Sequence, residues 1–198
     1  MPSPSAPAPA HQGHGHRTWL HLLPDDQELV LNPEQLRETA ALLVAVGLAS
    51  PGPQPEQLLP GPRFAQLLGG RGELPMAGAA RGEVRLEVGV LRCYPDPGPQ
   101  GFDTEPPRGY RAACPGCATT IDFFRLRFPF PEPLRAVCPG CGGTLDVPQL
   151  PWTPRLATAR TELTFGDLVG RPSLRGTEVL ARLGQLWKAT VREVHVTL

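Results

Sequence analysis

The sequence has little lysine, isoleucine or asparagine: among its 198 residues, Lys188, Ile121 and Asn32 are the only ones of their kind. The other 18 basic residues are arginines, an imbalance that we attribute to GC-rich coding rather than to phosphate recognition. The net charge is zero, so the chain lacks the strongly basic or acidic tail that often binds nucleic acids or other charged partners.

Long apolar runs are also absent, since the longest candidate, Ala40–Ala49, is about half the length of a transmembrane helix. Residues 1–16 lack the basic stretch followed by an apolar stretch that marks a secretory signal. We therefore expect a cytoplasmic protein without a membrane segment.

Motifs for the common enzyme chemistries are missing as well. Trp187 precedes the only lysine, so a phosphate-binding G-K-[ST] motif cannot occur. The chain has neither the G-x-S-x-G motif of a serine nucleophile nor the H-E-x-x-H motif of a metalloprotease. His21 and His195 lie in expected strands, where we interpret them as structural residues. These absences favour a non-enzymatic protein.

Proline and glycine are abundant, with 26 and 22 residues, and proline is clustered. Three segments hold most of the prolines: residues 1–16, 51–62 and 95–107. The first, which also carries three histidines, has nothing to bury and is predicted to be disordered. The other two are predicted to be extended surface loops.

Between these loops the apolar pattern predicts regular elements. Alternation over Val84–Val90 predicts a half-buried strand, and Asn32, Pro33 and Gln35 form the start signal of a helix that ends near Gly47. The remaining expected strands are Thr18–Leu23, Glu28–Leu31, Leu156–Phe165 and Val191–Leu198, and the remaining expected helices are Phe64–Leu68 and Thr177–Lys188.

This order predicts an α+β fold with a ferredoxin-like β-α-β-β-α-β core and an insert between the second and third core strands. The alternative is another two-layer α+β arrangement of the same elements. The predicted organisation is a tail over residues 1–16, a core over 17–107 and 151–198, and an insert over 108–150.

The insert contains four cysteines in the pattern C-x2-C, 20 residues, C-x2-C: Cys114, Cys117, Cys138 and Cys141. Two C-P-G-C turns of this kind supply a closed tetrahedral shell of thiolates for one metal ion. Two disulfides are the alternative. A fifth cysteine, Cys93, and the lack of a secretory signal favour reduced thiols. We interpret Cys93 as a buried, unreactive thiol.

An internal repeat supports the metal site. Residues 111–122 read RAACPGCATTID and residues 135–146 read RAVCPGCGGTLD, with eight of twelve positions identical. The insert resembles the zinc-ribbon superfamily, whose knuckles often read C-P-x-C-G, although Ala118 stands where the second knuckle has Gly142. The resemblance implies one structural Zn²⁺. A rubredoxin-like iron centre that transfers electrons uses similar knuckles and is an alternative.

Between the knuckles, residues 121–130 read IDFFRLRFPF. As a strand, this segment would place Phe124, Leu126, Phe128 and Phe130 on one face and Ile121, Phe123, Arg125 and Arg127 on the other. Candidate contacts to a partner or a nucleic acid are Phe123, Arg125, Arg127 and Arg135. The insert becomes almost neutral once four thiolates around Zn²⁺ are counted, which disfavours nucleic acid. The leading hypothesis is therefore a zinc-containing protein–protein adaptor or structural component of a larger bacterial-type assembly. A nucleic-acid-binding ribbon and an iron redox protein are the alternatives.

Overall fold

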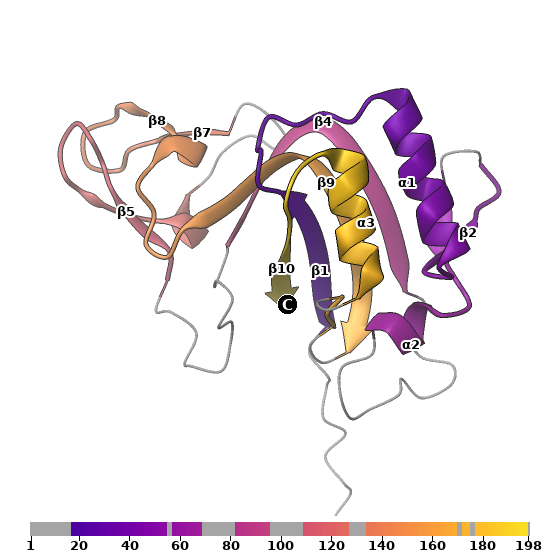
Figure 1. Cartoon of the computed structure of the whole chain (residues 1–198). Helices are drawn as coiled ribbons and strands as arrows, with labels where there is room; N and C mark the ends of the chain where they lie inside the picture. The colour runs from indigo at the N-terminus through magenta and orange to yellow at the C-terminus, as the bar shows by residue number, and fades with distance from the viewer. Residues whose placement is uncertain are drawn as a thin grey trace, which may run out of the picture.

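The protein is a mixed α+β structure with a curled antiparallel sheet and few helices (Figure 1). The computed structural model describes residues 17–54, 57–68, 82–95, 109–126, 134–169, 172–174 and 177–197. The sheet strands are β1 (Arg17–Pro24), β2 (Ala49–Pro51), β3 (Leu58–Pro60), β4 (Glu83–Pro95), β9 (Leu156–Val169) and β10 (Val191–Thr197). The helices are α1 (Pro33–Ala45), α2 (Phe64–Leu68) and α3 (Glu178–Trp187).

The six strands follow the order β10-β1-β9-β4-β3-β2, and every neighbouring pair is antiparallel. The two longest strands, β4 and β9, pair along nearly their whole length. The predicted α+β class is thus confirmed. Among the described residues, no helix combines the length and the apolar character needed to span a membrane.

Helices α1 and α3 cover one face of the sheet, where the larger hydrophobic core lies (Figure 1). Asn32 caps α1 as predicted, since its side chain accepts from the backbone amides of Glu34 and Gln35 and the Gln35 side chain completes the capping box. The Trp187 indole of α3 donates a 3.0 Å hydrogen bond to the Thr39 hydroxyl of α1. Because both side chains are fully buried, this bond fixes the two helices against each other.

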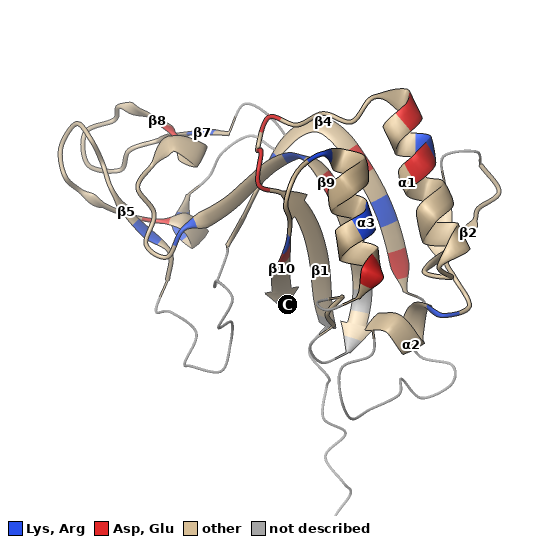
Figure 2. Ribbon diagram, in the orientation of Figure 1, with Lys and Arg blue, Asp and Glu red and all other residues tan. Residues whose placement is uncertain are grey.

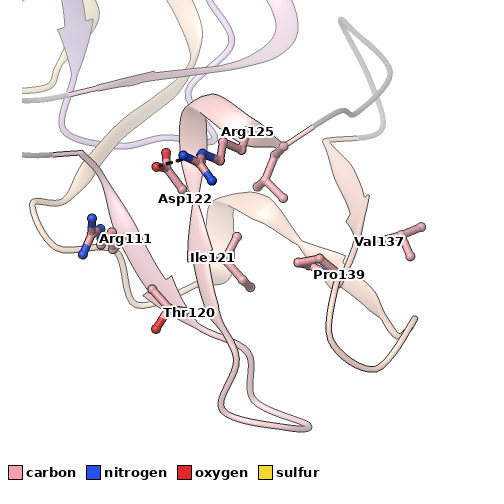
Figure 3. A pocket seen from close by; sticks show the side chains of 8 residues that line it. Arg111, Thr120, Ile121, Asp122, Arg125, Val137 and Pro139 are labelled. Carbon is pink, nitrogen blue, oxygen red and sulfur yellow. Dashed lines mark ion pairs between the residues drawn. The ribbon is translucent and has the colours of Figure 1, made fainter.

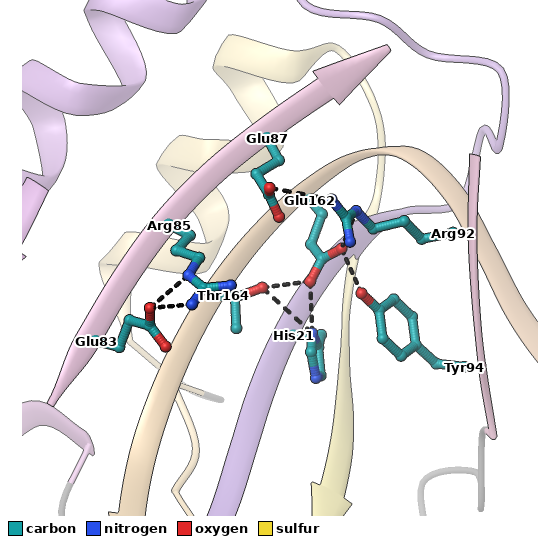
Figure 4. A network of polar contacts seen from close by, with 8 residues as sticks. All are labelled: His21, Glu83, Arg85, Glu87, Arg92, Tyr94, Glu162 and Thr164. Atoms are coloured by element: carbon teal, nitrogen blue, oxygen red, sulfur yellow. Dashed lines mark hydrogen bonds and ion pairs between the residues drawn. The ribbon is translucent and has the colours of Figure 1, made fainter. Parts of the chain in front are cut away.

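The opposite face of the sheet carries a buried polar network centred on Glu162 (Figure 4). The Glu162 carboxylate lies 2.6 Å from His21 Nδ1, accepts a 2.6 Å hydrogen bond from the Tyr94 hydroxyl and accepts another from Thr164. The rings of His21 and Tyr94 stack at 4.3 Å, and Arg92 Nε lies 3.4 Å from the same carboxylate. Strands β1, β4 and β9 all contribute, so the network ties the middle of the sheet together.

Curling of the sheet brings β4 towards β10 on this face, although the two strands are not hydrogen-bonded neighbours. A small apolar cluster fills the space between them, made of Leu23, Ala157, Ala159 and Val194 with Tyr94 packed against it. The small side chains of the two alanines in β9 allow this close approach.

Strand β4 serves two cores because its register with β9 shifts between Val88 and Arg92. Before the shift, Val84, Leu86 and Val88 face the core under the helices. After it, Leu91 and Cys93 pack against a second hydrophobic cluster in the cysteine-containing insert. The irregularity therefore re-aims the strand, as a β-bulge does.

Two expected elements differ from the structure. Residues 28–31 form no strand; instead the carbonyl of Leu29 accepts a hydrogen bond from the Thr161 hydroxyl of β9, so this segment is tied to the sheet by a side chain. The Pro-rich segment 51–62, expected to be a loop, contains β3 and ends the short β2–β3 hairpin. Residues 1–16 lie outside the described residues, and the proposed domain boundaries stay predictions.

We predict that Glu162→Gln lowers the free energy of unfolding at pH 7 by about 1.5–3 kcal/mol, because hydrogen bonds to a charged acceptor are lost. Burial alone raises the pKa of Glu162, but hydrogen bonds from His21, Thr164 and Tyr94 outweigh it and hold this pKa below its ordinary value. Such a group stabilises the fold above its unfolded pKa, about 4.3, and this contribution is lost as the pH falls through the folded pKa.

Urea unfolding at several pH values checks this prediction. The difference in stability between wild type and Glu162→Gln should be largest near neutral pH and should shrink below about pH 4. Glu38→Gln, at an exposed position in the interior of α1, is the matched control. A difference that is independent of pH would contradict the role of the ionised carboxylate.

Candidate metal centre

The insert folds as two matching hairpins. We call the described residues 109–126 and 134–152, which contain these hairpins, the ribbon. The strands are β5 (Arg111–Ala113), β6 (Thr120–Asp122), β7 (Arg135–Val137) and β8 (Thr144–Asp146). The first pair has Arg111 opposite Asp122, and the second has Arg135 opposite Asp146. The sequence repeat is therefore a structural repeat. Figure 1 shows both hairpins at the far end of the β4–β9 pair, away from the helices.

Each C-P-G-C turn is closed by the same backbone hydrogen bonds. The amide of Cys114 donates to the Thr119 carbonyl at 2.9 Å, and the amide of Cys138 donates to the Gly143 carbonyl at 2.8 Å. The residue after the second cysteine is left-handed in both turns, with φ of 59° at Ala118 and 72° at Gly142. Glycine adopts this conformation freely, whereas alanine costs about 1–2 kcal/mol, so the first turn is held by its surroundings.

The four cysteine sulfurs converge between the two turns, all within 4.8 Å of one another. Cys114 Sγ lies 3.9 Å from Cys141 Sγ, and Cys117 Sγ lies 3.7 Å from Cys138 Sγ. A tetrahedron with Zn–S bonds of about 2.3 Å has edges of about 3.8 Å, so the sulfurs fit a tetrathiolate metal. The cysteines are free thiols, as the sequence predicts.

The electrostatics of the four thiols also favour a cation. The hydroxyl and the amide of Thr119 lower the pKa of Cys117 to about 6, and the backbone amides of Cys141 and Gly140 lower that of Cys138. The amide of Gly143 lowers the pKa of Cys141 too, but the neighbouring sulfurs of Cys117 and Cys138 outweigh it and raise this pKa to about 11. Thiolates at this spacing repel one another, and a divalent cation removes the conflict.

The two turns interlock through Thr119 and Gly140. A Cβ added at Gly140 would lie 2.1 Å from the Thr119 hydroxyl oxygen and 3.2 Å from Cys117 Sγ. The Thr119 hydroxyl in turn lies 3.2 Å from Cys117 Sγ. Glycine at this position thus lets a residue of the first turn reach across to the second and orient a sulfur of the site.

A compact apolar cluster packs against the buried side of the four-sulfur site. Its members include the buried residues Tyr110, Ile121, Leu145, Val147 and Trp152, with Cys114 and Cys138 at its edge. The Trp152 indole donates a 2.7 Å hydrogen bond to the Val147 carbonyl, which closes the base of the ribbon. Cys117 and Cys141 are exposed, so the site is buried on one side only.

The structure places the four predicted contact residues differently from one another. Phe123 is partly buried and meets Trp152 edge-on at 5.6 Å, so it packs inside the ribbon. Arg125 and Arg135 are exposed, and Arg127 lies outside the described residues. Phe124, which the sequence analysis did not select, is 67% exposed, and Val137 is 66% exposed.

Phe123 is partly buried and Phe124 is exposed, the reverse of the expected strand faces, because the strand stops at Asp122. Residues Phe123–Arg125 form a 3-10 turn, η2, capped by a 3.0 Å hydrogen bond from the Phe124 amide to the Asp122 carboxylate. The repeat contained the signal for this turn, since Phe123–Arg125 corresponds to Val147–Gln149, a second 3-10 turn with a proline near its start.

Cys93 is separate from the four-sulfur site. It is partly buried in β4, and burial raises the pKa of its thiol to about 12. A thiol with this pKa stays protonated at neutral pH, which makes it a poor nucleophile or metal ligand.

Comparison of the chain with known protein families, curated proteins and solved structures finds no match. The functional argument therefore depends on the ribbon itself.

We predict that Gly140→Ala weakens metal affinity by about 10–100-fold, the range typical of changes that displace residues orienting a ligand. The new methyl group must displace Thr119 or the Cys117 sulfur. Gly143→Ala is the matched control, because its Cβ would meet only Cys141 Sγ, at an ordinary 3.4 Å. Competition for Zn²⁺ with a chromogenic chelator measures both variants. Equal affinity of the two would show that the contact between the turns does not orient the site.

Proposed function

We propose that the chain is a zinc-binding protein whose ribbon docks onto another protein, as a non-enzymatic adaptor or structural component of a larger cytoplasmic assembly. The observation that carries the metal proposal is the convergence of four sulfurs at tetrahedral spacing. Cys114, Cys117, Cys138 and Cys141 would hold Zn²⁺. A shell of four thiolates is closed, so the ion would contribute folding free energy rather than bind a substrate.

Two observations support a protein as the partner. The ribbon exposes large apolar side chains, Phe124 and Val137, at a distance from the main core. Its described charges are mixed in sign, and Figure 2 shows basic and acidic positions interleaved along β4 and α1 as well. A surface of this kind suits an interface with an apolar centre and a polar rim better than it suits a phosphate backbone.

A nucleic-acid-binding ribbon is the second candidate. It is favoured by Phe124, which is exposed beside the exposed Arg125 and could stack on a base. However, Asp122 lies next to this pair, with its carboxylate 3.9 Å from Arg125 Nε. A carboxylate at this position repels phosphates, so we rank this function second.

We also propose that the core is ferredoxin-like. Numbered among themselves, the four long strands β1, β4, β9 and β10 lie in the order 4-1-3-2 and are antiparallel throughout. That order, with helices α1 and α3 on one face of the sheet, supports a split β-α-β arrangement. The ribbon then extends the hairpin formed by the second and third core strands.

The purified protein should contain one zinc ion per chain. Cys138→Ser should reduce the zinc content to well below one, while Cys93→Ser, a cysteine outside the cluster, should leave it unchanged. Elemental analysis measures the content, and circular dichroism should show a local loss of structure in Cys138→Ser only, because metal binding there is coupled to folding. A coloured, iron-loaded protein would contradict the zinc assignment.

A photo-crosslinking residue in place of Phe124, introduced in the native host, tests the adaptor function. We expect a discrete protein adduct that is lost in combination with Cys138→Ser. The same residue in place of Val30, which is 49% exposed outside the ribbon, is the control. Adducts that disappear on nuclease treatment but resist protease would contradict a protein partner and support the second candidate.

A further inference from the structure

A half-open pocket of about 590 Å³ lies on the ribbon between β6 and β7 (Figure 3). Its apolar lining comes from Ile121, Leu126, Val137 and Pro139. The polar lining consists of Thr120 and Asp122 with Arg111 and Arg125. The volume is in the range of pockets that bind ligands.

The pocket adjoins a strand edge. Within the described part of the chain, β6 pairs only with β5 and β7 pairs only with β8. The outer edge of β5 is occupied, because Arg111 exchanges backbone hydrogen bonds of 3.0 and 2.7 Å with Thr153. The open edge of this hairpin is therefore β6.

The hydrogen-bond pattern shows which backbone groups face that edge. The carbonyl of Thr119 accepts from the amide of Cys114, and the amide of Phe123 donates to the carbonyl of Tyr110, so the backbone groups of the residues between Thr119 and Phe123 alternate in direction. Ile121 faces β5, whereas the amides and carbonyls of Thr120 and Asp122 point outwards. Both residues line the pocket. An added strand would find two outward donors and two outward acceptors at this place.

Among the described residues, one of the two arginines at the pocket has no ion-pair partner. Arg125 Nε lies 3.9 Å from the Asp122 carboxylate, with 88% of the Arg125 side chain exposed. Arg111 is exposed, and no described acidic side chain forms an ion pair with it (Figure 3). Arg111, Thr120 and Asp122 share one face of the hairpin, because Arg111 is opposite Asp122 in the register. Ile121 lies on the other face, where it is buried in the apolar cluster of the ribbon.

We propose that this pocket binds an extended segment of a partner protein that alternates apolar and acidic residues and adds as a strand to the edge of β6. This inference rests on the proposed adaptor function and names the surface and the partner chemistry. Strand addition uses the outward groups of Thr120 and Asp122 for affinity. Alternate side chains of the segment then point to opposite faces, so apolar ones meet the partly exposed Leu126 and the exposed Val137 while acidic ones approach Arg111.

The same geometry disfavours a nucleic acid at this place. The described pocket lining has no aromatic ring on which a base could stack. Its two guanidinium groups and one carboxylate leave a single net positive charge, which can pair with one acidic side chain but is far from the basic footprint of a nucleic-acid binder. A peptide segment can instead satisfy the backbone groups at the strand edge.

Three fluorescein-labelled nonapeptides test the proposal by fluorescence anisotropy with the full-length, zinc-loaded protein. The peptides alternate valine with glutamate, with lysine or with serine. The valine–glutamate peptide should bind at least tenfold more tightly than the valine–lysine peptide. Arg111→Glu should reverse this order, while Arg182→Glu, an exposed arginine on α3, should leave it unchanged. Zinc content confirms that each variant is folded.

Two further measurements locate the site. Two versions of the valine–glutamate peptide carry N-methyl groups on either the odd or the even backbone nitrogens. Only one version should lose binding, because only one of these two sets of amides faces β6. In spectra of ¹⁵N-labelled protein, the peptide should shift the amide signals of Thr120, Asp122 and Val137. Equal binding of the three peptides, or no binding at all, would overturn the proposal.

The outcomes separate this proposal from the adaptor function. Two results would overturn the pocket assignment but leave a protein partner. The first is that the peptide shifts amide signals of the core only. The second is that Arg111→Glu binds none of the peptides and yet still forms the Phe124 crosslink. Shifts of Thr120 and Val137 by an oligonucleotide of mixed sequence, with no effect of any peptide, overturn both.

Discussion

The antiparallel pairing of β4 with β9 joins the hydrophobic core under the helices to the apolar cluster of the ribbon. One half of this ladder carries the residues under the helices, and the other half leads to the base of the ribbon, where Leu91 and Cys93 pack. The buried carboxylate of Glu162 sits near the point where the register shifts and binds side chains from three strands. Without this ladder neither cluster would have a second layer to pack against.

The ribbon calls for a different interaction, the attraction between a cation and crowded thiolates. Its strands have three residues each, and two-stranded hairpins of that length are at best marginally stable in water. The small cluster around Trp152 supplies packing, and four sulfurs bound to the proposed ion would supply the cross-link. Because Cys114 and Cys138 are buried while Cys117 and Cys141 are exposed, such an ion would lie at the boundary between that cluster and the solvent.

Local signals in the sequence were sufficient for the helix capped by Asn32, for the main strands and for the cluster of four cysteines, because each depends on residues close together in the chain or on a short repeat. The exposure of Phe124 was missed because a two-residue period was extended past Asp122, where a side-chain cap turns the backbone. The Glu162 network could not be predicted, since its partners come from three strands that only the tertiary fold brings together. The pocket beside β6 likewise exists only once both hairpins are placed.

The register pair formed by Pro95 and Leu156 has a consequence for how the chain folds. The ladder can extend to this pair only after residues 96–155 have returned to their starting point, and the entropy lost in closing such a loop grows with the number of unconstrained residues. A ribbon tied by the proposed ion would shorten that loop to the segments on either side. Such an ion would therefore lower the entropic cost of completing a sheet that it does not touch.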